Sequence, residues 1–137
     1  MLFRSIVVFN FLVGNTDSHI KNFSLLYSPN QRAVRLAPAY DIVSTAVYPE
    51  STREMAFFIG DALSLDDLTR DSFLLAAKEI GLGERMAMRR FDAMCDKFVP
   101  ALRASAAALA AEGFPNALEL ERSILETGGM KEVSGTV

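Results

Sequence analysis

The feature that most constrains this chain is an apolar segment, Ile6 to Val13, that runs directly into a dense polar cluster. From Leu2 to Val13 apolar residues fall on nearly every side of a helix, which is typical of a helix surrounded by core. Gly14 then provides a natural helix end. We therefore expect a buried helix that holds residues 15–22 as a loop on a rigid base, which is how functional side chains are best positioned.

The polar cluster combines a carboxylate, an imidazole, an ammonium group and an amide. Its members, within six residues, are Asp17, His19, Lys21 and Asn22. Such a density of polar groups beside a buried element is costly unless the groups bind something. After the cluster come two strand-like runs, Phe23 to Tyr27 and Ala33 to Leu36, separated by turn-forming residues 28–31. The sequence therefore predicts a β-hairpin directly after the cluster.

The predicted hairpin would return the chain to the polar cluster. Pro38 favours an extended backbone conformation at the residue before it, Ala37, and limits further strand pairing. The second strand should therefore end near Ala37. Asp41 follows, and the hairpin would bring it back towards Asn22. Two carboxylates and an amide gathered in this way suit a magnesium–nucleotide site. One carboxylate orients or deprotonates an attacking hydroxyl, while the amide oxygen and the other carboxylate hold the metal.

The spacing of these residues matches known phosphoryl-transfer machinery. In the catalytic loop of protein kinases an Asp is followed five residues later by an Asn, and a metal-binding Asp comes further on. Here Asp17 and Asn22 have that spacing. The blocks NTDSHIKNFS (residues 15–24) and RLAPAYDIVST (residues 35–45) resemble the two signature blocks of HipA-type serine/threonine kinases, the toxins of bacterial toxin–antitoxin pairs. The two blocks together are far more specific than a lone D-x-x-x-x-N.

The resemblance implies a role for each matching residue. It implies a catalytic base at Asp17 and magnesium ligands at Asn22 and Asp41. It also implies that ATP and Mg²⁺ are the cofactors, and that the residues that bind them are His19, Lys21, Asn22, Tyr40 and Asp41. A protein hydroxyl would be the substrate. The partners that it implies are a HipB-like helix-turn-helix antitoxin or a separate N-terminal kinase lobe.

The resemblance covers residues from about Leu2 to about Ile124, but only the last part of the family's architecture. No Gly-rich phosphate loop follows a convincing strand in this sequence. We therefore expect a mainly α fold: a helical kinase-like C-lobe with one short β-hairpin that leads to the metal-binding Asp, within a full-length family that is α+β. Residues 1–127 should form this lobe and residues 128–137 a flexible tail. The lobe alone should be a weak or inactive kinase.

Length and charge exclude several other classes of protein. A chain of 137 residues, half of them hydrophobic, is best interpreted as one domain. Its net charge of −3 and pI near 5.1 give no general attraction for nucleic acid or an anionic membrane.

The single cysteine, Cys95, cannot form an internal disulfide and lies among apolar residues, so we expect a buried thiol. The apolar run near the N-terminus lacks a signal-peptide cleavage site and is too short to span a bilayer, so a cytoplasmic protein is expected.

The rest of the chain predicts irregular structure followed by helices. Residues 42–61 show little periodicity and, by resemblance, would lie near an incoming substrate. A helix capped by Thr69 or Asp71 should end at Gly81, with Phe73, Leu74, Ala77 and Ile80 buried. A longer helix from about Glu84 to Ala111 should be bent or split by Pro100, and a last helix should begin near Pro115 and end at Gly128. Its apolar positions are Leu118, Leu120, Ile124 and Leu125.

Two alternatives to a kinase lobe stay open at this stage. One is a non-catalytic interaction module or truncated remnant that binds an antitoxin-like partner. The other is a helical domain that binds a divalent metal or a nucleotide for another purpose. The presence of Asp17, Asn22 and Asp41 together favours the kinase lobe, because a remnant need not retain the metal-binding set.

Overall fold

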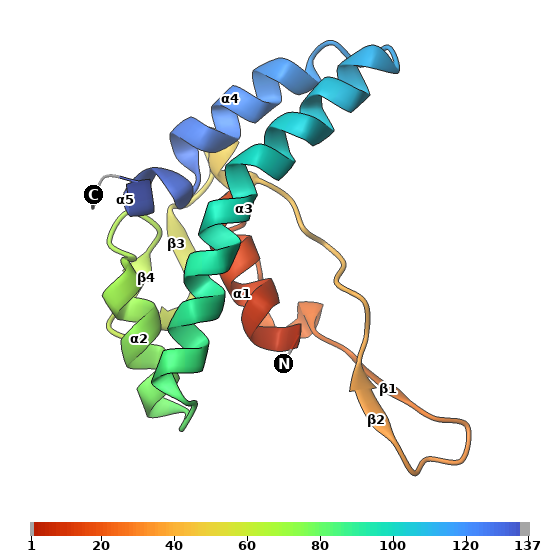
Figure 1. Cartoon of the computed structure of the whole chain (residues 1–137), viewed down its shortest axis with the longest axis vertical. Coiled ribbons are helices and arrows are strands. Elements are labelled where there is room, and N and C mark those ends of the chain that lie inside the picture. The colour runs from red at the N-terminus through yellow and green to blue at the C-terminus, as the bar shows by residue number, and fades with distance from the viewer. Residues whose placement is uncertain (1, 135–137) are drawn as a thin grey trace.

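The computed structural model describes residues 2–134, with the side chains of residues 5–133. Helices dominate, as the sequence predicts, and two antiparallel hairpins accompany them. Figure 1 shows the helix α1 (Leu2–Val13) at the centre, packed against the long helix α3 (Glu84–Ala111), which runs beside α4 (Ala117–Thr127) in the opposite direction. In the described part of the chain no helix is long and apolar enough to cross a membrane.

Helix α1 ends as the sequence predicts. Gly14 has a φ of +73°, and its N–H donates to the carbonyl oxygen of Phe11 at 3.0 Å. The N–H of Asn15 donates to the carbonyl oxygen of Asn10 at 2.8 Å, which completes a glycine-ended helix terminus of the Schellman type. Phe11 and Leu12 in the last turn are fully buried. The end of α1 is therefore a fixed point within the core.

The first hairpin is also confirmed. Strands β1 (Leu25–Tyr27) and β2 (Val34–Leu36) pair antiparallel, with Leu25 opposite Leu36 and Tyr27 opposite Val34. The N–H of Ala37 still donates to the carbonyl oxygen of Ser24 at 2.7 Å, so pairing stops just before Pro38. The hairpin projects away from the helices (Figure 1).

A second hairpin lies where irregular structure was expected. Residues 45–47 form a 3-10 turn, and strands β3 (Glu54–Ile59) and β4 (Ala62–Ser64) pair antiparallel. The prediction for residues 42–61 is therefore wrong over β3. Met55 and Ile59 are buried in the core, and Gly60 turns the chain with a φ of +60°. Packing against α2 stabilises a strand whose own pattern is weak.

Helices α2 (Arg70–Glu79) and α3 match their predicted bounds closely. Thr69 caps α2 through a reciprocal capping box with Ser72. The side chains of Phe73 and Phe91 bring the two helices together, with ring centroids 4.8 Å apart. The prediction that Ile80 is buried is wrong, because it follows the last turn of α2 and is 64% exposed.

The long helix is not split by its proline. Helix α3 continues through Pro100 to Ala111, although Figure 1 shows its axis changing direction along its length. A proline removes one backbone donor, and a helix of 28 residues can absorb that loss by bending. Phe91 and Phe98 are buried, and the Cys95 thiol is buried as predicted. Burial raises the pKa of Cys95 to about 11.

The C-terminal segment is more ordered than the sequence predicts. Helix α4 ends at Gly128 as expected, with Ile124 buried, but Leu118 and Leu120 are about half exposed. A flexible tail was expected from residue 128. Instead, Met130–Ser134 forms a short helix, α5, and the N–H of Gly129 donates to the carbonyl oxygen of Phe11 at 3.0 Å. Residues 135–137 lie outside the described part of the chain.

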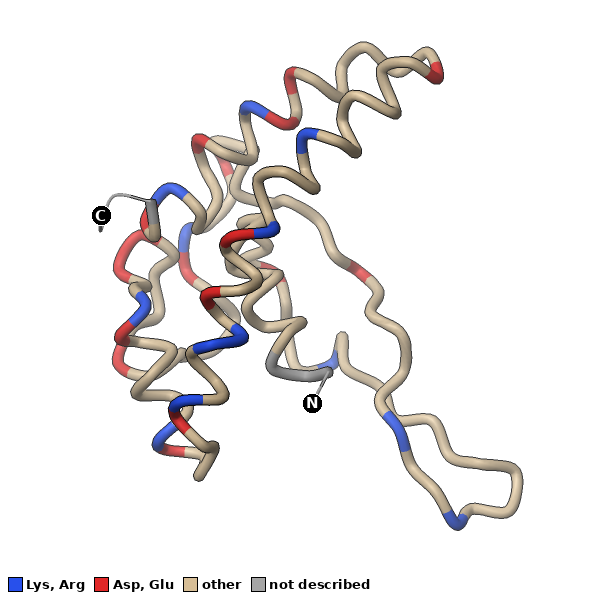
Figure 2. The backbone as a smooth tube through the Cα atoms, viewed as in Figure 1, with Lys and Arg blue, Asp and Glu red and all other residues tan. Residues whose placement is uncertain are grey.

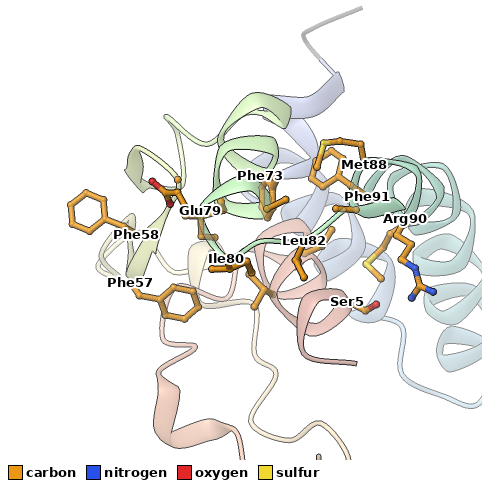
Figure 3. Close-up of a pocket in the computed structure, with 18 of the residues that line it drawn as sticks. Ser5, Phe57, Phe58, Phe73, Glu79, Ile80, Leu82, Met88, Arg90 and Phe91 are labelled. Atoms are coloured by element: carbon orange, nitrogen blue, oxygen red, sulfur yellow. The ribbon is translucent and has the colours of Figure 1, made fainter. Parts of the chain in front are cut away.

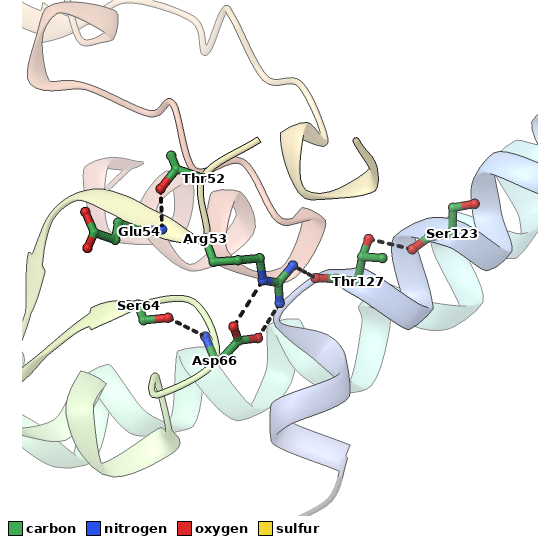
Figure 4. Close-up of polar contacts among 7 residues, drawn as sticks. All are labelled: Thr52, Arg53, Glu54, Ser64, Asp66, Ser123 and Thr127. Carbon is green, nitrogen blue, oxygen red and sulfur yellow. Dashed lines mark hydrogen bonds and ion pairs between the residues drawn. The ribbon is translucent and has the colours of Figure 1, made fainter. Parts of the chain in front are cut away.

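An arginine joins the second hairpin to the end of α4. Arg53 makes a forked ion pair with Asp66, with 3.1 Å from Nε to Oδ2, and its Nη1 donates to the carbonyl oxygen of Thr127 at 2.8 Å (Figure 4). The hydrogen bonds from Arg53 lower the pKa of Asp66, and burial opposes them. The ion pair therefore connects three segments that are distant in sequence.

This ion pair predicts a dependence of stability on pH. Because the folded-state pKa of Asp66 lies below its unfolded value of about 3.9, its contribution is present above that pH and is lost as pH falls through the folded-state pKa. Asp66 is half exposed, so we expect Asp66→Asn to destabilise the protein by no more than about 1 kcal/mol at pH 7. Urea unfolding at pH 7 and pH 3 measures this. The difference from wild type should shrink at pH 3, and Asp67→Asn, the matched control, should show no such pattern.

Candidate active site

Four buried polar residues support the loop that follows α1. Asn10, Asn15, Thr16 and Ser18 are each no more than 4% exposed. Asn10 Nδ2 donates to Ser18 Oγ at 2.7 Å, and Asn15 Nδ2 donates to Asn10 Oδ1 at 2.9 Å. Every buried polar side-chain atom in the described part of the chain has a hydrogen-bond partner. The loop is therefore held by a satisfied network, the condition under which buried polar groups fix one conformation.

This network was not predicted as part of the site. Asn10 interrupts the apolar run, and that interruption was the one available signal, because a buried amide in an apolar helix must find partners. Ser44 and Thr45, which the resemblance implies lie near a substrate, also fix the end of α1. Ser44 Oγ donates to the carbonyl oxygen of Val13, and Thr45 Oγ1 donates to that of Gly14 at 3.1 Å.

Several hydrogen bonds join the two sequence blocks. Asn15 Nδ2 donates to the carbonyl oxygen of Asp41 at 3.1 Å. The Tyr40 hydroxyl donates to the carbonyl oxygen of Lys21 at 3.1 Å and lies 2.7 Å from Ser24 Oγ. The structure therefore brings Tyr40 and Asp41 against the segment that contains Asp17 and Asn22, across the hairpin between them.

Asp17 and His19 lie together at the surface. Asp17 Oδ1 is 3.0 Å from His19 Nε2, and the two side chains are 65% and 47% exposed. The N–H of His19 also donates to the carbonyl oxygen of Asp17 at 2.9 Å, so the backbone turns tightly at this point. A carboxylate that is exposed and contacted on one side is accessible to a substrate hydroxyl and oriented by its neighbour.

Asn22 has an oxygen available for a ligand. Its Nδ2 donates to the carbonyl oxygen of Asp17 at 3.2 Å, which fixes the orientation of the amide. None of the described residues donates a hydrogen bond to Oδ1 of Asn22. The short 3-10 helix η1 (Ile20–Asn22) presents this side chain after the turn at His19. Asn22 can therefore offer a neutral oxygen to a hard cation.

Asp41 adopts a left-handed backbone conformation. Its φ of +56° is uncommon for a residue other than glycine, although Asp and Asn tolerate it best. Its carboxylate is on an exposed residue, while its carbonyl oxygen is held by Asn15. Such backbone strain persists where the surroundings impose it and is concentrated at functional sites.

The donor set suits magnesium bound with a nucleotide. Among the described residues, no three His, Cys, Asp or Glu side chains are grouped so that they could hold a metal ion. One amide oxygen and one or two carboxylates are the few protein ligands that Mg²⁺ takes when phosphates and water complete its shell. Lys21 is exposed in the same segment. Between Ser18 and Tyr40 there are basic residues and no Asp or Glu (Figure 2), so the local charge favours an anion.

Comparison with known proteins connects this geometry to a family. A family model described as "HipA-like C-terminal domain" matches residues 1–102. A protein of Sinorhizobium fredii strain NGR234 named "Putative kinase Y4mE" is 38% identical over 95 residues, which cover 69% of this chain and 22% of Y4mE. The "Serine/threonine-protein kinase toxin HipA" of Shewanella oneidensis strain MR-1 is 34% identical over 76 residues, covering 56% of this chain and 17% of that protein.

The fold has a solved counterpart. A chain in the complex of HipA, HipB and operator DNA from the Shewanella oneidensis toxin–antitoxin system superposes with a TM-score of 0.69 at 20% identity. The match covers 96% of this chain and 31% of that chain. At 20% identity, this structural similarity shows that the two chains share a fold, and it shows nothing about function. This chain spans about a fifth to a third of the length of these proteins.

Proposed function

The chain belongs to the family of HipA-like C-terminal domains, and we propose that it is the catalytic C-terminal portion of a serine/threonine protein kinase. In this proposal the γ-phosphoryl group of ATP is transferred to a protein hydroxyl with Mg²⁺. The observation that carries the proposal is the junction of the two motif blocks by the Asn15–Asp41 and Tyr40–Lys21 hydrogen bonds. This junction supports the proposal because it ties the segment that contains Asp17 and Asn22 to the segment that contains Asp41.

Each residue has a distinct role in the proposed reaction. The Asp17 carboxylate accepts the proton of the substrate hydroxyl as its oxygen bonds to the γ-phosphorus and the bond to ADP breaks. Asn22 Oδ1 and the Asp41 carboxylate would hold the metal. Mg²⁺ supplies positive charge that neutralises the phosphate oxygens during transfer. His19 and Lys21 lie in the segment proposed to contact the phosphates.

Tyr40 has a proposed role that the geometry refines. We propose that it contacts the nucleotide from the position just before Asp41. Its hydroxyl forms hydrogen bonds with Lys21 and Ser24, so it also fixes the spacing between the hairpin and residues 17–22. Tyr40 is 44% exposed, and an aromatic ring that is partly exposed can stack on a planar ligand.

The proposed partners follow from the relatives. The solved HipA chain is in a complex with HipB and its operator DNA. We propose a HipB-like antitoxin as a partner of this chain, and we propose no direct contact with DNA, because the net charge is −3. Because the chain spans a minor part of its relatives, we also propose that phosphoryl transfer by the chain alone is weak and that a preceding lobe is needed for full activity.

One observation favours a second candidate function, a non-catalytic interaction module. Leu25, Tyr27 and Val34 lie on one face of the first hairpin and are each more than half exposed. A two-stranded sheet with an uncovered apolar face is typical of a contact with another protein. Such a module would need neither ATP nor the Asp41 carboxylate.

Binding of ATP separates the two candidates. With Mg²⁺ and ATP at ten times the dissociation constant, linkage gives about 1.4 kcal/mol of stabilisation, or a rise in Tm of about 5 °C for a domain of this size. We expect Asp41→Asn to abolish the rise while it preserves the fold, because Asn accepts the left-handed backbone conformation. Differential scanning fluorimetry measures this. An unchanged Tm in the wild-type chain would support the interaction module and exclude nucleotide binding.

A further inference from the structure

An apolar opening lies beside α1, and the residues that line it include Ile20 of η1, the element that also contains Lys21 and Asn22. This opening is a cavity of about 370 Å³ between α1, β3, α2 and α3. Its walls include Val7 and Val8 of α1, Phe57 of β3 and Phe91 of α3 (Figure 3). The charged side chains that line it are Glu79 and Arg90. A cavity of this size and lining normally holds an apolar group from a ligand or another polypeptide.

Three residues of the lining carry large apolar side chains that are mostly exposed. Ile20 is 70% exposed, Phe58 is 66% exposed and Ile80 is 64% exposed. They come from η1, from β3 and from the end of α2, so three separate elements each present an apolar side chain at one opening. Single exposed hydrophobic residues are ordinary, but a group around an apolar cavity indicates a surface that another molecule covers.

The position of the cavity indicates what covers it. The fold match takes in 96% of this chain but 31% of a HipA chain, so most of such a protein lies outside this fold. Ser5, Val7 and Val8, in the first turns of α1, line the cavity. In a HipA-like protein, therefore, the polypeptide that precedes α1 arrives beside this opening.

We propose that this cavity is the docking site for an apolar face of the region that precedes α1 in a HipA-like kinase, with Ile20, Phe58 and Ile80 buried in the contact. The proposal rests on the proposed function. It also connects docking to the candidate active site, because Ile20 begins η1 and its neighbours are Lys21 and Asn22. Covering Ile20 restrains the segment that presents the Asn22 oxygen.

Thiol labelling tests the docking site. We would make Phe58→Cys and Ile80→Cys in this chain alone and in a hybrid in which the part of Y4mE that precedes its matched segment is joined to Met1. Phe114→Cys is the matched control, since Phe114 is 61% exposed at the turn between α3 and α4, and it does not line the cavity. The native Cys95 is buried, so its slow reaction reports that the fold is intact.

We expect maleimide labelling at positions 58 and 80 to slow at least tenfold in the hybrid and labelling at position 114 to change less than twofold. Equal rates at positions 58 and 80 in the two proteins, with Cys95 still slow, would overturn the proposal. Protection of the same positions in the chain alone that increases with its concentration would also overturn it, because a second copy would then be the occupant. Labelling needs no nucleotide or metal, so failure of docking is distinguishable from failure of the proposed kinase function.

Discussion

Asp17→Asn should lower the rate of phosphoryl transfer from ATP by at least about a hundredfold, because a general base typically contributes between a hundredfold and ten-thousandfold. The substitution removes the charge that accepts the hydroxyl proton and preserves the size of the side chain, including an oxygen that can still meet His19 Nε2. The hybrid with the preceding part of Y4mE is the suitable protein, since the chain alone is expected to be weak. Transfer of labelled phosphate to a generic protein acceptor, at saturating Mg²⁺ and ATP, gives the rate.

The matched control for this prediction is Asp61→Asn. Asp61 is an exposed residue in the turn between β3 and β4 and belongs to neither motif block, so its replacement should leave the rate within about twofold. An unchanged rate in Asp17→Asn would remove the proposed base. A loss of equal size in both variants would indicate a general effect on the fold, which circular dichroism would reveal.

Gly128→Ala should destabilise the fold by about 3 kcal/mol or more, with a fall in Tm of about 10 °C or more. A Cβ atom at this position would lie 2.5 Å from the carbonyl oxygen of Leu12 and 2.8 Å from that of Ile124. Both are backbone atoms, and Leu12 is fully buried, so neither can move away without displacing α1 or α4. Urea unfolding, followed by circular dichroism, measures the loss.

Gly83→Ala is the control for this close contact. No atom lies within 4 Å of an added Cβ at Gly83, and its φ is −60°, so alanine should change the stability by less than about 1 kcal/mol. If Gly128→Ala destabilised the fold as little as Gly83→Ala, the end of α4 would not approach the end of α1 as closely as described. The claim that the candidate site stands on a rigid base would then fail too, since Gly14 belongs to the same contact.

The parts of the fold that were predictable from the sequence depend on local signals. The end of α1 at Gly14, the hairpin before Pro38 and the bounds of α3 all follow from residues within a few positions of one another. Strand β3 and helix α5 depend on contacts that are distant in sequence. The bond from Gly129 to Phe11 is an example, because nothing near Gly129 indicates a partner more than a hundred positions away.

In the candidate site, too, some residues could be predicted from the sequence and others could not. The motif residues could be named from their spacing, because phosphoryl transfer needs those chemical groups in that order. Their supporting residues could not be named, because a buried amide such as Asn15 acquires its role only when Asn10 and Asp41 come within hydrogen-bonding distance. The sequence therefore predicts which groups react, and tertiary packing determines how they are held.

The proposed function depends most on Asn22 and Asp41 holding one metal ion beside Asp17. Replacing Mg²⁺ with paramagnetic Mn²⁺ in the presence of ATP tests it in the chain itself, through the broadening of backbone amide signals in a nuclear magnetic resonance spectrum. We expect the signals of Asp17, Asn22 and Asp41 to broaden first, and Asp41→Asn to prevent the effect. Broadening centred instead on the acidic residues Glu54, Asp61 and Asp67, with Asn22 and Asp41 unchanged, would contradict the proposed function.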